Sequence, residues 1–330
     1  MAKESKKTVT VADLISVIGL AVLAFFTFMG AMFKTGGVLS ASILYAVGIT
    51  LFTWALVLLL KSAKTARSDQ AKFKVFEILL AVAYIALAVF GATFLMRYFS
   101  ISTSKDEYIS YFKQDVESVN DLFTRYESQE SEAISKTGTG LRLTGYICDA
   151  TVKSMLSDKG ITANDRESIN TYVGIVDGAI LKGDYEYFKA SYDKAVSSYL
   201  SDVQGWAAMK VPFAASGMED LALEVAQTLT EKSSLTGTDG NPLKFNLVRG
   251  SDSVVHLSED SLVYTYEKPT LLFQDRLRSA ETTLSIPGLA IAIVIHLLVL
   301  ISYFSAYRSK VVRRKGKGYA IQDGGINLYE

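Results

Sequence analysis

The residue best placed to do chemistry is a histidine inside an apolar run. His296 lies near the middle of segment 286–307, which is otherwise almost entirely hydrophobic. An ionisable side chain at such depth in a membrane is costly, and it usually faces a helix-bundle interior or a water-filled cavity. Glu77 and Asp13 are the two other polar candidates within apolar segments. Such a set of groups would suit a proton relay or an ion site.

Two interpretations of His296 stay open. A relay needs an acid nearby, but Glu77 and Asp13 lie about ten residues away along a helix axis, which is roughly 15 Å. That separation is too large for direct contact. The alternative is a neutral imidazole hydrogen-bonded to a hydroxyl on a neighbouring helix, such as that of Thr50 or Thr53. We favour this second interpretation.

The two carboxylates are expected at the edges of their segments. Asp13 stands at the start of an apolar run, where a carboxylate can cap a helix and meet the positive end of its dipole. Glu77 follows Lys72 and Lys74. We expect it to neutralise one of these lysines rather than to take part in transport.

The rest of the sequence predicts no catalytic residues, no metal site and no cofactor. His256 is the only other histidine and Cys148 the only cysteine, so no His/Cys cluster has metal-ligand spacing. No glycine-rich phosphate loop and no Gly-x-Ser-x-Gly elbow occurs. We expect Cys148 to be a small buried residue rather than a reactive thiol.

Four apolar segments must position these residues. They cover 12–33, 38–60, 75–96 and 286–307, and each is long enough to cross a bilayer, for which about 20 residues are needed. The first is expected to be a retained helix, because no small-residue cleavage signal follows it. The sequence therefore predicts an α-helical polytopic membrane protein with four transmembrane helices.

Charge predicts the orientation of these helices. Residues 97–285 carry 19 Lys/Arg against 28 Asp/Glu, whereas the rest of the chain carries 15 against 6. Lys and Arg accumulate on short cytoplasmic loops, so the N-terminus 1–11, the loop 61–74 and the tail 308–330 are expected inside. The basic residues expected at the cytoplasmic membrane surface are Lys61, Lys64, Arg67, Lys72, Lys74, Arg308, Lys310, Arg313, Arg314, Lys315 and Lys317.

The third segment is expected to continue outside the membrane as an amphipathic stalk. Apolar residues recur there at alternating spacings of three and four, which places them on one face of a helix. That packing face comprises Ile109, Phe112, Val116, Val119, Phe123 and Tyr126. The glycines in Ser135–Gly140 are expected to end the stalk.

The remainder of the 97–285 domain reads as mainly helical, with one small β region. Ser216 and Glu219 have the spacing of a capping box and predict a helix start there. Alternating apolar residues between 243 and 267 predict a three-stranded antiparallel meander. The fold class is therefore a four-helix membrane bundle with a mainly α (α+β) extracytoplasmic domain inserted between helices 3 and 4.

These features favour a non-enzymatic protein of a bacterial inner (cytoplasmic) membrane with a periplasmic domain. Its expected partners are the lipid bilayer and a protein partner, a ligand or a second copy of the chain. The acidic domain lacks the basic footprint that nucleic-acid binding needs. The alternative function is a transporter or channel subunit that uses His296.

Overall fold

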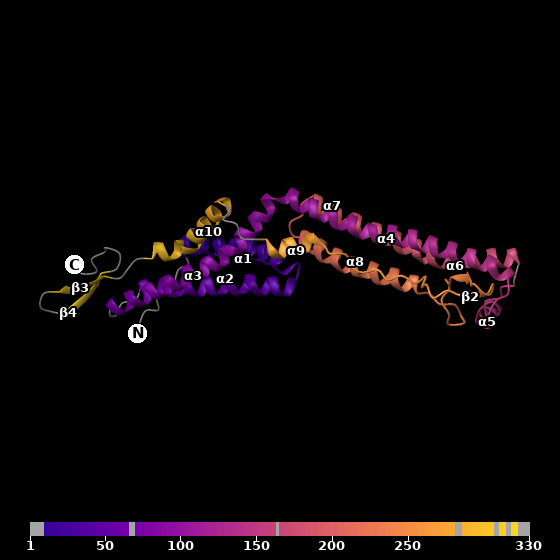
Figure 1. Cartoon of the computed structure of the whole chain (residues 1–330). Helices are drawn as coiled ribbons and strands as arrows, with labels where there is room; N and C mark the ends of the chain where they lie inside the picture. The colour runs from indigo at the N-terminus through magenta and orange to yellow at the C-terminus, as the bar shows by residue number, and fades with distance from the viewer. Residues whose placement is uncertain are drawn as a thin grey trace, which may run out of the picture. The chain divides into compact units, whose positions relative to one another are not determined.

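The computed structural model describes most of the chain and divides it into two compact units. The described residues are 10–65, 70–162, 165–280, 286–306, 310–314 and 318–322. Unit 1 comprises Met1–Tyr108, Ala208–Phe213 and Gln274–Glu330, and unit 2 comprises Ile109–Ala207 and Ala214–Phe273. Figure 1 labels the helices and strands of both.

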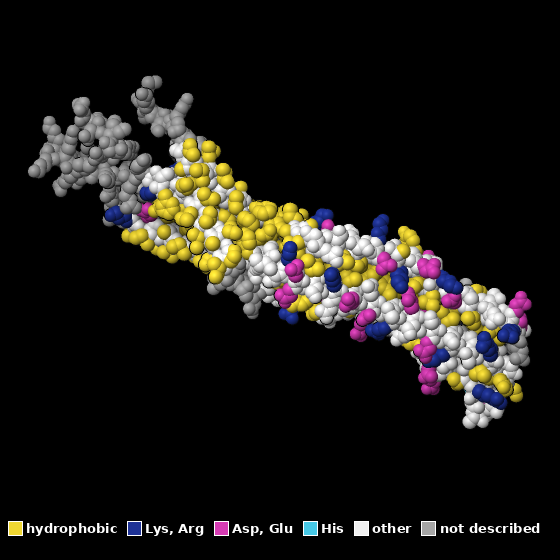
Figure 2. All heavy atoms as spheres, turned by 90° about the horizontal axis from the view of Figure 1, so that it is seen from above, with side chains coloured by type: hydrophobic (Ala, Val, Ile, Leu, Met, Phe, Trp, Pro, Cys, Tyr) yellow, Lys and Arg dark blue, Asp and Glu magenta, His cyan; other side chains and the backbone are white. Residues whose placement is uncertain are grey.

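Unit 1 is a bundle of four long helices. These are α1 (Val11–Thr35), α2 (Leu39–Thr65), α3 (Gln70–Thr103) and α10 (Ile286–Ser305). Each contains a stretch long and apolar enough to cross a membrane, with a mean hydropathy of 2.3 to 2.5. Helix α1 packs against all three others. In Figure 2 hydrophobic side chains cover the drawn face of this bundle. The predicted helical membrane protein is confirmed at this level.

Small residues let the helices of the bundle approach closely. A Cβ atom on Gly30 of α1 would lie 2.0 Å from the carbonyl oxygen of Phe94 in α3, and one on Gly19 would lie 2.9 Å from the backbone nitrogen of Val299 in α10. Only glycine fits at such contacts. The core beside them is aliphatic, with Leu23 and Leu95 fully buried.

A short hairpin follows α10 in the basic tail. Strands β3 (Lys310–Arg314) and β4 (Gly318–Gln322) pair antiparallel, with Val312 opposite Ala320. Of the basic tail residues, Arg308, Lys315 and Lys317 lie outside the described residues. This hairpin was not predicted from the sequence, because the many Lys and Arg residues of the tail obscure the alternation of apolar and polar residues that marks a strand.

Unit 2 is built around α4 (Lys105–Leu141), which enters it at Ile109. A 3₁₀ turn, η1 (Arg142–Gly145), and α5 (Ala150–Asp158) follow. Helices α6 (Arg166–Leu181) and α7 (Asp184–Gln204) then run back along α4, and α8 (Val211–Ser233) runs out again (Figure 1). Charged side chains are spread over the drawn surface of this unit (Figure 2).

The predicted packing face of α4 is where the helices of unit 2 meet. Phe112, Val119, Phe123 and Tyr126 are buried, whereas Ile109 and Val116 are half-buried. The Phe123 ring lies 4.8 Å from that of Tyr192 in α7, and the Tyr126 ring stacks on Tyr185 at 5.0 Å. The Tyr126 hydroxyl also donates to the carbonyl of Ile180 at 2.9 Å.

The predicted end of the stalk at Ser135–Gly140 is wrong, because α4 continues to Leu141. The two glycines serve close packing instead. A Cβ atom on Gly138 would lie 3.2 Å from Val173 of α6, and one on Gly140 would lie 2.9 Å from the backbone nitrogen of Leu247. Glycine lowers helix propensity by only about 1 kcal/mol, so tertiary packing overrides it here.

The predicted capping box at Ser216 and Glu219 is also wrong. Helix α8 begins five residues earlier, at Val211, and Ser216 lies inside it. Pro212 stands in the first turn of α8. Proline is tolerated there, because the backbone N–H that it lacks would have no partner within the helix.

The predicted meander is reduced to two strands. Among the described residues, β1 (Leu247–Arg249) pairs with β2 (Val255–Leu257), and Leu262–Tyr266 forms no strand. The physical reason is that α8 takes the place of a third strand. The backbone N–H of Tyr264 donates to the Ser233 hydroxyl at 2.8 Å, and that of Tyr266 to Thr230 at 2.9 Å.

One buried carboxylate joins the beginning of unit 2 to its end. Asp115 on α4 is 2% exposed. Its two oxygens accept the backbone N–H groups of Leu272 at 2.7 Å and Phe273 at 2.9 Å. These are the first residues of α9 (Leu272–Ser279), where free N–H groups and the helix dipole favour an anion.

Replacing Asp115→Asn should therefore destabilise unit 2. The amide keeps one acceptor, but it turns an N–H₂ group toward a backbone donor. Since hydrogen bonds to charged groups contribute about 1.5–3 kcal/mol each, we expect a loss of about 2 kcal/mol in the free energy of unfolding. Urea unfolding of the detergent-solubilised chain measures it. The control is Asp121→Asn, an exposed site on the same helix, and equal midpoints for the two variants would contradict the prediction.

Candidate functional site

His296 is held by a tyrosine inside the four-helix bundle. Its Nδ1 lies 2.9 Å from the hydroxyl oxygen of Tyr84 on α3, and the two rings meet edge to face. The hydroxyl beside His296 belongs to Tyr84 rather than to Thr50 or Thr53. His296 also lines a groove between α3 and α10 of about 280 Å³.

Glu77 is hydrogen-bonded from α10. The Tyr303 hydroxyl donates to its carboxylate at 2.5 Å. Lys64 donates to the carbonyls of Tyr303 and Phe304 at the end of α10, and its ammonium group lies 4.7 Å from the centre of the Tyr303 ring. Lys74 is exposed, and the side chain of Lys72 lies outside the described residues.

Asp13 joins the start of α1 to the end of α2. Its carboxylate accepts from Lys61 at 2.5 Å, and it forms a reciprocal capping box with Thr10. The expected helix cap is thus present. Of the other predicted basic residues, Arg67 and the side chains of Lys310, Arg313 and Arg314 lie outside the described residues.

These contacts join neighbouring helices. Among the described residues they do not connect into a continuous polar path. Asp13, Lys61, Lys64, Glu77 and Tyr303 all lie at one end of the bundle, where α1 and α3 begin and α2 and α10 end. The groove at His296 is almost wholly apolar. The arrangement can fix helix register through hydrogen bonds between helices.

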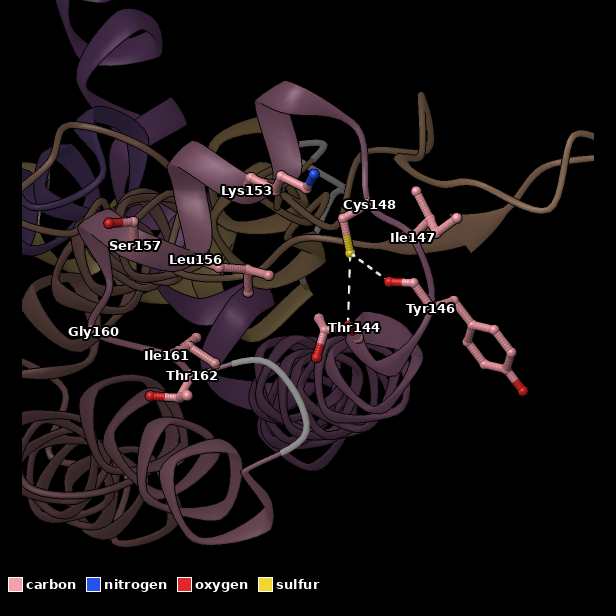
Figure 3. Close-up of a pocket in the computed structure, with 10 residues that line it drawn as sticks. All are labelled: Thr144, Tyr146, Ile147, Cys148, Lys153, Leu156, Ser157, Gly160, Ile161 and Thr162. Atoms are coloured by element: carbon pink, nitrogen blue, oxygen red, sulfur yellow. Dashed lines mark hydrogen bonds between the residues drawn. The ribbon is translucent and has the colours of Figure 1, made fainter.

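Unit 2 contains a pocket at the far end of α4 from Ile109. Helix α4 runs 33 residues within the unit, about 50 Å at 1.5 Å per residue. The pocket has a volume of about 510 Å³, within the range of small-molecule sites. Figure 3 shows its wall, to which η1, the segment between η1 and α5, α5 itself and the residues after α5 contribute. The lining residues are Thr144, Tyr146, Ile147, Cys148, Lys153, Leu156, Ser157, Gly160, Ile161 and Thr162.

Cys148 lines this pocket but is a poor nucleophile. Its thiol is buried and donates to the carbonyl oxygens of Thr144 and Tyr146 (Figure 3). Burial raises the pKa of the Cys148 thiol, so less of it is thiolate at neutral pH. The group fills space in the wall, as the sequence predicts for a buried cysteine.

A histidine clamp lies behind the pocket wall. Asp149 caps α5 by accepting the N–H of Val152 at 2.7 Å. The same carboxylate lies 3.0 Å from His256 Nδ1, and Asp252 lies 3.0 Å from His256 Nε2. A neutral imidazole carries one N–H, so two carboxylate contacts require the charged form. With both nitrogens engaged, His256 holds β2 to α5 and has no nitrogen free to act as a base.

The rim of the pocket presents apolar side chains to solvent. Ile147 is 72% exposed and Tyr146 is also exposed, and both line the pocket. The next residue, Cys148, bridges to Val255 of β2, which pairs with β1. Val248 of β1 and Leu257 of β2 are exposed elsewhere on this small sheet. Arg249 lies 4.0 Å above the Tyr146 ring and holds it by a cation–π contact. An apolar rim around a pocket is typical of a binding surface.

Comparison of the chain with models of protein families, with curated proteins and with solved structures gives no match. The site must therefore be interpreted from its own geometry. Among the described residues, no group of three His, Cys, Asp or Glu side chains is placed to hold a metal ion.

The sequence shows parts of this site but not their assembly. The stretch from Tyr146 to Cys148 is visibly apolar, and His256 is visibly alone on a strand. Nothing in their spacing brings Asp149 to His256, because 107 residues separate the two. Tyr84 was missed as the partner of His296 for a similar reason, since one tyrosine in an apolar helix carries no directional signal.

The clamp predicts a pH-dependent stability of unit 2. Hydrogen bonds that His256 donates to Asp149 and then to Asp252 raise the pKa of its imidazole above the usual 6.5. The contribution of the clamp to stability is therefore complete below pH 6.5 and is lost as pH rises through the raised pKa. His256→Gln should therefore lower the urea midpoint at about pH 6 and change it little at about pH 9.

The control for this measurement is Asp260→Asn, an exposed carboxylate in the loop after β2. It should leave the pH profile of the wild-type chain unchanged. A profile for His256→Gln that stays parallel to wild type across this pH range would show that the clamp does not titrate.

Proposed function

We propose that the chain is a non-enzymatic component of a bacterial inner membrane whose unit 2 binds a partner protein or ligand on the periplasmic side. In this proposal α1, α2, α3 and α10 are transmembrane helices with both termini in the cytoplasm. The protein would serve as a scaffold or sensor subunit of a cell-envelope assembly.

The observation that carries the proposal is the pocket with its exposed apolar rim. An exposed isoleucine and tyrosine beside a pocket of this volume are unfavourable in water unless something covers them. The wall behind them is held firmly, because the Asp149–His256–Asp252 clamp and the Cys148–Val255 bridge join three segments. A held wall loses little entropy on binding.

Charge supports the orientation. Residues 97–285 have a balance of −9, while the remaining residues have +9. The end of the bundle that carries Lys61 and Lys64 is continuous in sequence with the basic loop and the basic tail, which favours that end for the cytoplasm.

The transporter or channel subunit remains the alternative. In its favour, Nε2 of His296 is buried with no hydrogen-bond partner among the described residues. Against it, the groove beside His296 is apolar, and Tyr84 occupies the other ring nitrogen. A transport site needs groups that bind or pass a polar solute, so we prefer the binding function.

The orientation predicts which residues an outside reagent reaches. In a Cys148→Ala background, Tyr187→Cys on α7 and Lys74→Cys on α3 each supply one exposed thiol. A membrane-impermeant maleimide should label Tyr187→Cys in intact spheroplasts and Lys74→Cys only after the membrane is permeabilised. The opposite pattern would reverse the topology.

The binding role predicts cross-linking at the pocket rim. A photoreactive benzophenone side chain placed at Ile147 should give an adduct of defined mass in growing cells, because the rim is covered by the partner. The control position is Tyr187, also apolar and 78% exposed but on α7. Identical products from both positions, or none from Ile147, would refute a binding site at the rim.

A further inference from the structure

One segment leaves unit 2 and returns to the membrane bundle. Ala208–Phe213 belongs to unit 1, although the chain on both sides of it belongs to unit 2. It connects the end of α7 with the first turn of α8. Val211 is fully buried and Pro212 is buried, so the segment is packed into unit 1 rather than passing over it.

The segment rests on the turn between α1 and α2. A Cβ atom on Gly37 would lie 2.8 Å from the carbonyl oxygen of Pro212 and 3.5 Å from the backbone nitrogen of Phe213. Gly37 has a φ of +89°, which L side chains rarely adopt. The turn is therefore shaped for direct backbone contact with this segment.

The α1–α2 turn marks one surface of the hydrocarbon layer. Helix α1 has 25 residues, which gives about 37 Å, slightly more than the roughly 30 Å of a hydrocarbon core. Lys34 in the last turn of α1 and Arg97 on α3 place charges near the same end. Arg97 donates to the carbonyls of Leu277 and Arg278 at the end of α9. Charged side chains of this kind mark the end of an apolar span.

Two large apolar side chains of the Ala208–Phe213 segment are exposed. Met209 is 53% exposed and Phe213 is 46% exposed, and Lys210 between them is exposed as well. Val38 and Leu39, which follow Gly37 and begin the apolar surface of α2, are also exposed. Phe213 thus lies beside the surface that the α2 span presents to lipid.

From these contacts we propose that Met209 and Phe213 insert into the headgroup–acyl boundary of the leaflet that contains the α1–α2 turn. The proposal depends on α1 and α2 spanning the bilayer and not on the pocket in unit 2. The occupant is lipid rather than protein, because the backbone of Phe213 lies against Gly37, directly before the exposed apolar residues that begin α2. Apolar side chains buried at this boundary are typical of interfacial anchors.

Tryptophan quenching by brominated lipid tests this anchor in the full chain. The chain has two tryptophans, Trp54 on α2 and Trp206, so a Trp54→Phe, Trp206→Phe background is silent. Phe213→Trp, Met209→Trp and the control Tyr187→Trp are introduced singly. Each variant is reconstituted into phosphatidylcholine–phosphatidylglycerol vesicles brominated either near the headgroup or near the chain ends.

We expect Phe213→Trp and Met209→Trp to emit at shorter wavelength than Tyr187→Trp. They should lose the larger part of their emission to lipids brominated near the headgroup, and less to lipids brominated near the chain ends. Tyr187→Trp should be unaffected by either lipid. Trp54 alone, with Trp206→Phe, reports quenching of a spanning helix and confirms that each reconstitution worked.

Two outcomes would overturn the proposal. Unquenched emission at long wavelength from both positions would place them in water. Unquenched emission at short wavelength would mean that protein, such as a second copy, covers them. Using two positions guards against one substitution that disturbs the turn.

Discussion

The architecture of unit 2 depends on burying a negative charge at Asp115. An isolated carboxylate in an apolar interior costs several kcal/mol, and only a full set of hydrogen bonds offsets this. Two backbone N–H groups at the start of α9 supply such bonds, so α4 fixes where the outgoing chain turns. The same helix carries Glu130, fifteen residues further on, which forms a buried ion pair with Lys244 at 0% and 1% side-chain exposure. The Ser233 hydroxyl also accepts from that lysine at 3.1 Å. Helix α4 therefore sets the position of two later segments, the one around Lys244 and the start of α9.

The two ends of unit 2 are held in different ways. Near Ile109 the contacts are a carboxylate and packed aromatic rings, whereas beyond Leu141 they are short strands, a capped helix and the histidine clamp. Helix α4 is unbroken to Leu141 and contains no proline, which is the commonest cause of a kink. A force or displacement at the pocket can therefore pass along the helix. This property would suit the proposed sensor or scaffold role.

The sequence predicts most elements but few of their endings. Apolar length alone finds the four helices of the bundle, and spacings of three and four find the face of α4 that carries Phe123 and Tyr126. It fails where a tertiary contact decides the local structure. Gly138 and Gly140 suggest a helix end, yet α6 and Leu247 lie against them. Pro212 suggests a helix end but lies in the first turn of α8. The pocket and the clamp depend on residues more than a hundred positions apart, such as Asp149 and His256, and no local pattern records such a pairing.

The hydroxyl groups of α8 have a consequence for solubility. Leu262–Tyr266 combines β-branched, aromatic and aliphatic residues without a charge, a composition that favours intermolecular cross-β pairing when its backbone is free. Ser233 and Thr230 take up the N–H groups of Tyr264 and Tyr266, so this extended segment offers a less complete edge to another chain. Helix α8 thus occupies part of the backbone edge of Leu262–Tyr266. Loss of either hydroxyl would therefore increase aggregation of the newly synthesised domain more than it would lower the stability of the folded protein.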